Sequence, residues 1–353
     1  MSVPTATRLS SVDFARVIAM VAVILIHVTS TYVNAESGAT LWGINLAFFL
    51  NQAARFCVPL FLFLSGLSLG LGQKDLSWPA FYKDRAKRIL PPYLFWCLVY
   101  WLRNCGFDPA VLAGQLGDPR RVLTVLLTGE PAAQLYFIPI ILQCYLLYPL
   151  LKKWVDRAPG RCFVWSLALS LVCQGGFYWQ FAGVLPACSN SYLWLLFPTW
   201  SFYFVAGMCL TPARLETLSS FCGRTAPALL ATGAVTLILY VADAKHTGAI
   251  HAVKPALLFV TPLVFLCALA VWQGLGRWAA AEGLTRFLSA HSMGIYYNHV
   301  LVLYFLRPFP RFSAGMSGML LLFAATFFLS LVVAVLLRLA AKTARRAVGR
   351  ALG

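Results

Sequence analysis

Long apolar runs alternate with short polar and basic segments along the whole chain. At about 1.5 Å of rise per helical residue, each run approaches the roughly 30 Å thickness of the hydrocarbon core of a bilayer. The pattern predicts an all-α polytopic membrane protein with about ten transmembrane helices, near residues 10–32, 46–71, 89–107, 133–151, 161–181, 192–211, 226–243, 254–273, 286–306 and 316–339.

The composition supports this prediction and limits the classes of partner. Of the 353 residues, 60% are hydrophobic and 11% are charged, and the mean hydropathy is +0.77, which excludes a soluble domain. The net charge of +17 comes from lysine and arginine clusters in short loops, the pattern that topology selection produces, so no nucleic-acid partner is expected. These clusters fall on alternate sides of the membrane and place both termini in the cytoplasm. The two longest outer loops, 108–132 and 243–254, are too short for a further domain, so residues 1–353 are expected to form one membrane domain.

The first span carries an arginine and a histidine within an apolar helix. Arg16 and His27 are separated by three helical turns plus about 20°, so they share a face, roughly 16 Å apart. The capping-box-like start at 10–13 and the outward direction place Arg16 at the cytoplasmic end and His27 in the outer half. An ionisable side chain inside a membrane span is costly, which makes it a functional hypothesis by default.

The basic residues before the third span predict a cationic cluster at the cytoplasmic face, formed by Arg16, Arg85, Lys87 and Arg88. A multiply phosphorylated ligand suits such a cluster because guanidinium groups pair bidentately with phosphate. The alternative is topology selection with lipid headgroup contact, and Arg16 alternatively snorkels to the interface. Pro91-Pro92 is expected to break the basic helix before the third span begins.

Three cationic or titratable side chains lie at a similar depth in the outer half of the predicted spans: His27, Arg55 and His299. Together they predict a polar cavity in which His27 acts as a general base or an acyl acceptor. The alternatives are hydrogen-bonded histidines between helices and an arginine paired with helix carbonyls. Aromatic residues near the outer ends predict an interfacial belt, with stacking on a sugar as the alternative: Trp42, Trp101, Tyr136, Tyr178, Trp179, Trp194 and Trp200.

Four sequence phrases, in this order, resemble the acyltransferase-3 family of bacterial integral-membrane O-acyltransferases, over nearly the whole chain. They are Arg16 with His27 after ten intervening residues, the phrase 55–66, Arg85-Ala-Lys-Arg88, and the phrase 289–299. The chain is most similar to stand-alone members, which lack a fused hydrolase-like domain and include enzymes that acetylate enterobacterial common antigen. One departure is Gln134-Leu-Tyr136-Phe137, where many members carry His-Leu-Trp-Phe, so a role of that histidine does not carry over.

The resemblance implies an O-acetyltransferase of the bacterial cytoplasmic (inner) membrane, with acetyl-CoA as co-substrate and a periplasmic or lipid-linked glycan as acceptor. Arg16, Arg85, Lys87 and Arg88 would then hold the nucleotide end of the donor. His27 would take the proton of a sugar hydroxyl or carry the acyl group itself, and Arg55 or His299 would stabilise the oxyanion. No metal is expected, and a homo-oligomer stays open.

The rival interpretation is a secondary transporter or flippase for a glycan-linked or small anionic substrate. Intramembrane histidine and arginine fit a transporter in outline, but no internal repeat and no intramembrane carboxylate is evident. A non-catalytic membrane scaffold would leave His27 unexplained.

Overall fold

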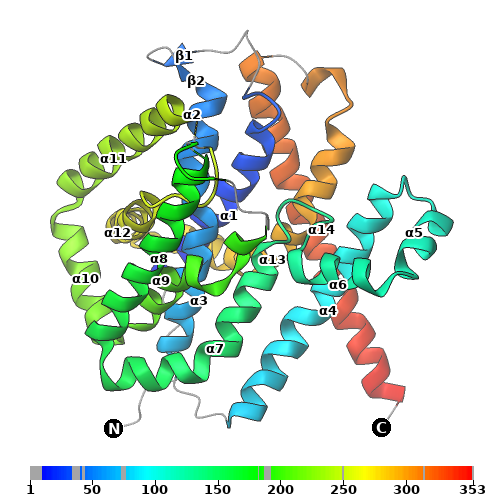
Figure 1. The fold of residues 1–353 in the computed structure, drawn as a ribbon, viewed down its shortest axis with the longest axis horizontal. Coiled ribbons are helices and arrows are strands. Elements are labelled where there is room, and N and C mark those ends of the chain that lie inside the picture. Colours follow the sequence, from blue (N-terminus) through cyan, green and yellow to red (C-terminus); the bar gives the residue numbers. More distant parts are fainter. Residues whose placement is uncertain are drawn as a thin grey trace.

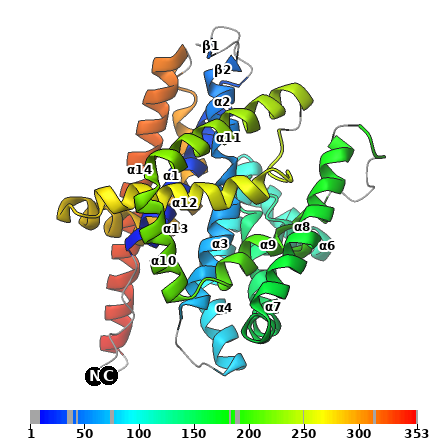
Figure 2. The same cartoon turned by 90° about the vertical axis from the view of Figure 1, so that its left-hand side faces the viewer.

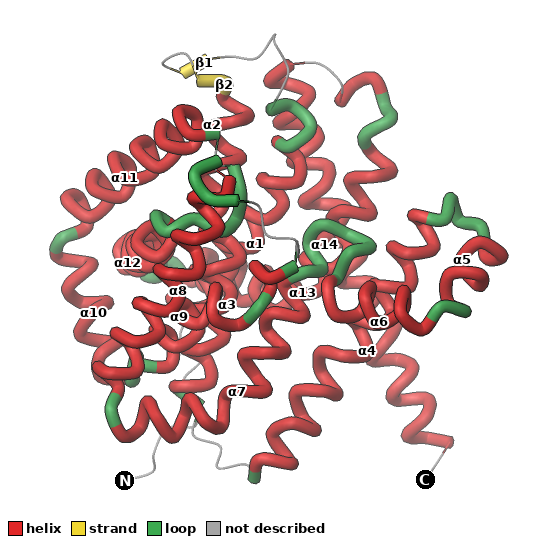
Figure 3. Tube along the Cα trace, viewed as in Figure 1, coloured by secondary structure: helices red, strands yellow, loops and turns green. Residues whose placement is uncertain are grey.

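The computed structural model describes residues 10–33, 40–41, 44–72, 77–181, 183–186, 192–248, 250–312 and 315–351. These residues are almost entirely helical, apart from a small antiparallel hairpin of β1 (Thr40–Leu41) and β2 (Ile44–Asn45) (Figure 3). The elements that build the bundle in Figure 1 are α1 (Ser10–Thr29), α2 (Leu46–Ala53), η1 (Ala54–Phe56), α3 (Cys57–Gly70), α4 (Trp78–Asn104), α5 (Pro109–Leu116), α6 (Pro119–Thr128), α7 (Phe137–Arg157), α8 (Pro159–Phe181), η2 (Leu193–Leu195), α9 (Phe197–Met208), α10 (Pro212–Arg224), α11 (Ala226–Thr247), α12 (Leu257–Leu275), α13 (Ala279–Leu306), η3 (Pro310–Phe312) and α14 (Gly315–Ala351).

Each of the ten expected spans coincides with a helix, but not every helix has the composition of a membrane span. Within the described residues, six helices are long and apolar enough to cross a membrane, or up to seven if the bent pair of α9 and α10 is one span. The helices α4, α7 and α13 fall outside this group, and each carries several charged residues in its sequence. The protein is therefore an all-helical, multi-pass membrane protein, and the number ten stays a prediction.

The start of α1, the end of α3 and the start of α13 meet at one end of the bundle. Arg16 donates to Asp13 at 2.7 Å, to Ser289 of α13 at 3.0 Å and to Ser68 of α3 at 3.4 Å. Ser10 donates to Glu282 at the beginning of α13. Because the end of α3 meets the starts of α1 and α13, α3 runs antiparallel to both helices. The predicted alternation of spans requires the same directions. We call this the Arg16 end, and the opposite end the His27 end.

Glycines bring α3 and α9 into close parallel contact. A Cβ atom added at Gly66 would lie 2.0 Å from the carbonyl oxygen of Phe204, and one added at Gly207 would lie 2.0 Å from that of Phe63. Gly66 and Gly70 form a Gly-x-x-x-Gly pair, which allows two helix backbones to approach within a membrane. In contrast, α12 crosses the bundle at a steep angle to α3 and α14 (Figure 2).

The expected break at Pro91-Pro92 is wrong, because α4 continues through both prolines from Trp78 to Asn104. Each proline lacks an N–H and so leaves a carbonyl one turn earlier without its helical hydrogen bond. Those carbonyls belong to Lys87 and Arg88, which are exposed, so solvent can satisfy them without unwinding the helix.

Candidate active site

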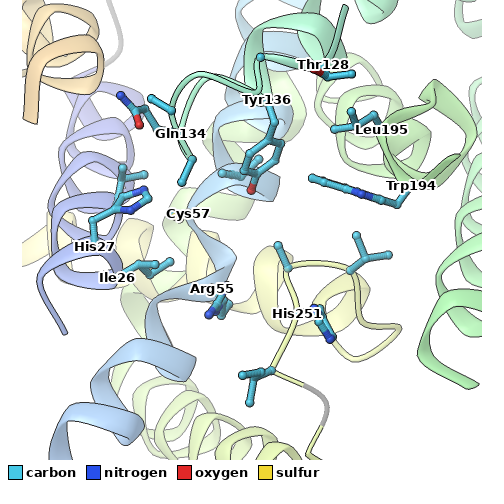
Figure 4. Close-up of a pocket in the computed structure, with 18 of the residues that line it drawn as sticks. Ile26, His27, Arg55, Cys57, Thr128, Gln134, Tyr136, Trp194, Leu195 and His251 are labelled. Atoms are coloured by element: carbon cyan, nitrogen blue, oxygen red, sulfur yellow. The ribbon is translucent and has the colours of Figure 1, made fainter. Parts of the chain in front are cut away.

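A cavity of about 840 Å³ lies at the His27 end (Figure 4). Its walls come from α1, η1 and the end of α8, and from the loops around residues 128–136, 192–195 and 250–253. Figure 4 shows His27, Arg55 and Tyr136 projecting into a common space, with Trp194 on the opposite wall. At Gly129, φ is +69° and an added Cβ would lie 2.5 Å from the backbone of Leu135, so glycine lets the loop fold tightly over the cavity.

Two histidines from α1 and α13 pack against each other beside this cavity. The ring centroids of His27 and His299 are 5.1 Å apart. His299 is fully buried, and its Nδ1 lies 3.1 Å from the carbonyl oxygen of Ile295. A carbonyl can only accept, so Nδ1 carries the proton and the Nε2 of a neutral ring is left as an acceptor. That Nε2 has no hydrogen-bond partner within the described residues, and neither ring nitrogen of His27 forms a hydrogen bond there.

Arg55 reaches the cavity from η1, the short 3₁₀ turn between α2 and α3. Its Nη2 donates to Oδ1 of Asn51 at 2.9 Å, and its Nε is buried without a hydrogen-bond partner among the described residues. Because the partner is a neutral amide, it does not cancel the positive charge of the guanidinium, and Arg55 lines the cavity.

The turn of α1 that carries His27 is held from outside the cavity. The carbonyl oxygen of His27 accepts from Nη2 of Arg307, which follows α13, at 3.0 Å, and from the hydroxyl of Ser30 at 2.8 Å. Because the main chain is fixed in this way, the imidazole has a defined origin from which to point into the cavity.

The predicted cationic cluster is only partly assembled at the other end of the bundle. Tyr145 of α7 lies within electrostatic range of both Arg16 and Arg85, and the guanidinium of Arg85 lies 5.5 Å from the centre of its ring. Lys87 is exposed, and Arg88 has a side chain that is 64% exposed and pairs with Asp84 at 2.9 Å. None of the four basic residues lines the cavity at the His27 end.

Several cavity residues were missed or interpreted differently from the sequence. Tyr136 and Trp194, expected in an interfacial belt, instead line the cavity with ring centroids 5.1 Å apart. His251, in the loop 243–254, was not expected at the site, but it reaches the same wall and stacks on Phe181. Burial lowers the pKa of His251 below its ordinary value, and the positive charges of Arg55 and Lys254 lower it further.

Gln134, the position at which the sequence departs from the family pattern, also lines the cavity. Its side chain is buried, and its main-chain carbonyl accepts from the hydroxyl of Tyr296. The departure therefore falls beside the candidate active site rather than on a remote surface. The part of the chain that the structure describes contains no group of three or more His, Cys, Asp or Glu side chains suited to hold a metal ion.

The fold and the cavity define a multi-pass membrane protein with a histidine pair and an arginine at one site. Residues 9–339 match the family model described as an acyltransferase domain, and the chain belongs to the acyltransferase-3 family. It is also similar to YfiQ of Bacillus subtilis (strain 168), named as a candidate membrane-bound acyltransferase, with 23% identity over 338 residues, or 90% of this chain and 88% of YfiQ. No solved structure matches the chain. Membership of this family makes the protein a membrane enzyme that transfers an acyl group from a donor to an acceptor.

Proposed function

We propose that the protein transfers an acetyl group from cytoplasmic acetyl-CoA to a hydroxyl of a periplasmic or lipid-linked glycan, in the bacterial cytoplasmic membrane. The observation that carries the proposal is the pairing of His27 with His299 beside a cavity that also receives Arg55. Arg16 and Arg85, which lie around Tyr145 at the opposite end of the bundle, support the choice of a nucleotide donor, because guanidinium groups suit its phosphates.

In the proposed reaction, neutral His27 takes the proton of the acceptor hydroxyl while the hydroxyl oxygen attacks the thioester carbon. The carbon–sulfur bond then breaks, and the imidazolium returns the proton to the leaving thiolate. Because Nε2 of His299 is an acceptor, it can receive an N–H of His27 but cannot donate to an oxyanion in this tautomer. Arg55 is thus the better oxyanion donor of the two residues proposed from the sequence.

An acyl-His27 intermediate is the alternative course of the same reaction. In that case the imidazole attacks the thioester first, and the hydroxyl takes the acyl group in a second step. Trapping of labelled acetyl on the protein in the absence of acceptor separates this course from direct transfer.

The proposal is tested with purified protein in detergent, radiolabelled acetyl-CoA and a glycan extract from the cell envelope of the source bacterium. We expect label to enter the glycan, and His27→Ala to lower the rate by at least 100-fold, since a general base contributes roughly 10²–10⁴. Wild-type transfer by a folded His27→Ala protein would refute the assignment. Detergent removes any gradient, so transfer there also distinguishes an enzyme from a secondary transporter. Transfer of label from succinyl-CoA but not from acetyl-CoA would show that the donor is succinyl-CoA rather than acetyl-CoA.

The ten-span topology with both termini in the cytoplasm is part of this proposal. It brings the Arg16 end to the cytoplasm, where acetyl-CoA is made, and the cavity to the periplasmic side. Single cysteines introduced at the ends of the helices, on a background without accessible cysteine, would report the side of each loop by labelling in intact cells. Labelling of a loop at the Arg16 end from outside would contradict the orientation.

A further inference from the structure

Asn51 belongs to α2 and lies one helical turn before Arg55. Its side chain faces α1, and the residue is 2% exposed. A buried primary amide is costly unless its two donors and its acceptor oxygen are satisfied. Asn51 satisfies all of them within the protein. Its Nδ2 donates to the carbonyl of Ile26 at 3.0 Å and to the hydroxyl of Thr29 at 3.2 Å, both on α1.

The oxygen of the same amide faces the other way. Oδ1 of Asn51 accepts from Nη2 of Arg55 at 2.9 Å and from Nε2 of Gln52 at 3.1 Å. The orientation is fixed by its partners, because the carbonyl of Ile26 can only accept and a guanidinium can only donate. A flipped amide would oppose donor to donor and acceptor to acceptor.

This one side chain therefore joins the two groups proposed for the chemistry. Ile26 immediately precedes His27, and Thr29 in turn donates to the carbonyl of Leu25 at 2.6 Å. A displacement of Arg55 relative to the turn that carries His27 would break hydrogen bonds on one side of the amide or the other.

The neutrality of the Asn51 amide also affects the electrostatics of the site. Aspartate has nearly the same shape and would accept from Arg55 equally well, but it would form a buried ion pair and cancel the charge of the guanidinium. It would also lose the donor that holds the carbonyl of Ile26. Among the described residues, Arg55 has no carboxylate partner, so its charge is presented to the cavity without internal neutralisation.

We infer that Asn51 is a positioning residue, whose amide fixes the guanidinium of Arg55 against the turn of α1 that carries His27 and leaves its positive charge for the reacting groups. The inference rests on the proposed function, because it acts through a role of Arg55 in acyl transfer. It adds a requirement for a neutral side chain at this position.

The experiment is a double-mutant cycle of Asn51→Asp and Arg55→Gln, with purified protein, radiolabelled acetyl-CoA and the cell-envelope glycan extract. When Arg55 is present, we expect Asn51→Asp to lower kcat at least tenfold and to change the KM for acetyl-CoA less than threefold. The reason is that the variant loses stabilisation of the transition state rather than binding of the donor. In the Arg55→Gln background we expect it to cost less than threefold. Equal losses in both backgrounds, or no loss in the first, would overturn the inference.

Asn104→Asp is the matched control. The amide of Asn104 also accepts from an arginine, Nε of Arg103 at 3.0 Å, and donates to a carbonyl, that of Pro131 at 2.9 Å, but it is exposed and does not line the cavity. We expect this variant to keep kcat within threefold. If Asn51→Asp does not fold, Asn51→Ser replaces it in the same cycle and tests the positioning role alone, because serine is neutral and too short to bridge the carbonyl of Ile26 and the guanidinium of Arg55. The loss of kcat is again expected to be at least tenfold when Arg55 is present and less than threefold in the Arg55→Gln protein.

The cycle also separates this inference from the proposed function. Wild-type activity of Arg55→Gln alone would refute the role of Arg55 in transfer. If Arg55→Gln lowers activity but Asn51→Asp causes the same loss of kcat with and without Arg55, only the positioning role would be refuted.

Discussion

Replacement of Gly66 by alanine tests whether the spacing of α3 and α9 sets the geometry of the site. The added Cβ would lie 2.0 Å from the carbonyl oxygen of Phe204 and 2.9 Å from its carbonyl carbon, both of them backbone atoms of α9. An ordinary van der Waals contact of a Cβ atom begins at 3.4 Å, so one helix must move by more than about 1 Å. Overpacking of this kind costs about 1–3 kcal/mol. Because α3 begins at Cys57, two residues after Arg55, such a displacement is expected to reach the site, where a misplacement of about 1 Å can cost roughly 10²-fold in rate.

The assay compares Gly66→Ala with Gly175→Ala by thermal unfolding in detergent and by acetyl transfer. Gly175 lies inside α8, and a Cβ added there would meet nothing within 4 Å. The control is therefore expected to be as stable as the wild type or more stable by up to about 1 kcal/mol, since alanine favours a helix over glycine. Gly66→Ala is expected to lower Tm by roughly 5 °C and activity at least tenfold. Equal behaviour of the two variants would refute the close-contact argument.

Two further predictions concern residues outside the cavity. Lys254 has a side chain that is 1% exposed, and its Nζ lies 3.1 Å from Oδ2 of Asp243. Asp243→Asn leaves that cation unpaired and is expected to cost about 2 kcal/mol in the free energy of unfolding, whereas Lys254→Met is expected to stay within about 1 kcal/mol; chemical denaturation measures both, and the reverse order would contradict the reasoning. At the Arg16 end, Arg85 packs on Tyr145 while Arg88 is mostly exposed and already paired. Calorimetry with CoA should therefore give an increase in Kd of about tenfold or more for Arg85→Ala and about threefold or less for Arg88→Ala, and equal increases would argue against a site around Tyr145.

The sequence predicted the helical class, the membrane setting and the family because these follow from apolar run length and from short ordered phrases. It also predicted that His27, Arg55 and His299 share a depth, since depth is set by position along a helix. Side-by-side placement is not set in that way. The pairing of His27 with His299 depends on how α1 packs on α13.

The rest could not be derived because it depends on tertiary contacts. The loops that close the cavity bring Tyr136, Trp194 and His251 together from three separate parts of the chain, and no local pattern encodes that meeting. Nothing in the sequence distinguishes Asn51 from other polar residues near Arg55. Its proposed positioning role follows only from its four hydrogen-bond partners in the structure. The continuity of α4 through Pro91-Pro92 is likewise a matter of which carbonyls solvent can reach.

The short turn η1 sets the rotational phase between the two halves of the apolar segment Leu46–Gly70. A 3₁₀ residue advances about 120° rather than 100°, so three of them add about 60° of rotation. That rotation allows α2 to present Asn51 toward α1 while α3 presents Gly66 toward α9. A substitution that converted η1 to regular α-helix would bring one of these two faces out of register by about 60°. The candidate active site and the close contact of α3 with α9 are thus linked by the change of helical pitch at η1, the turn that contains Arg55.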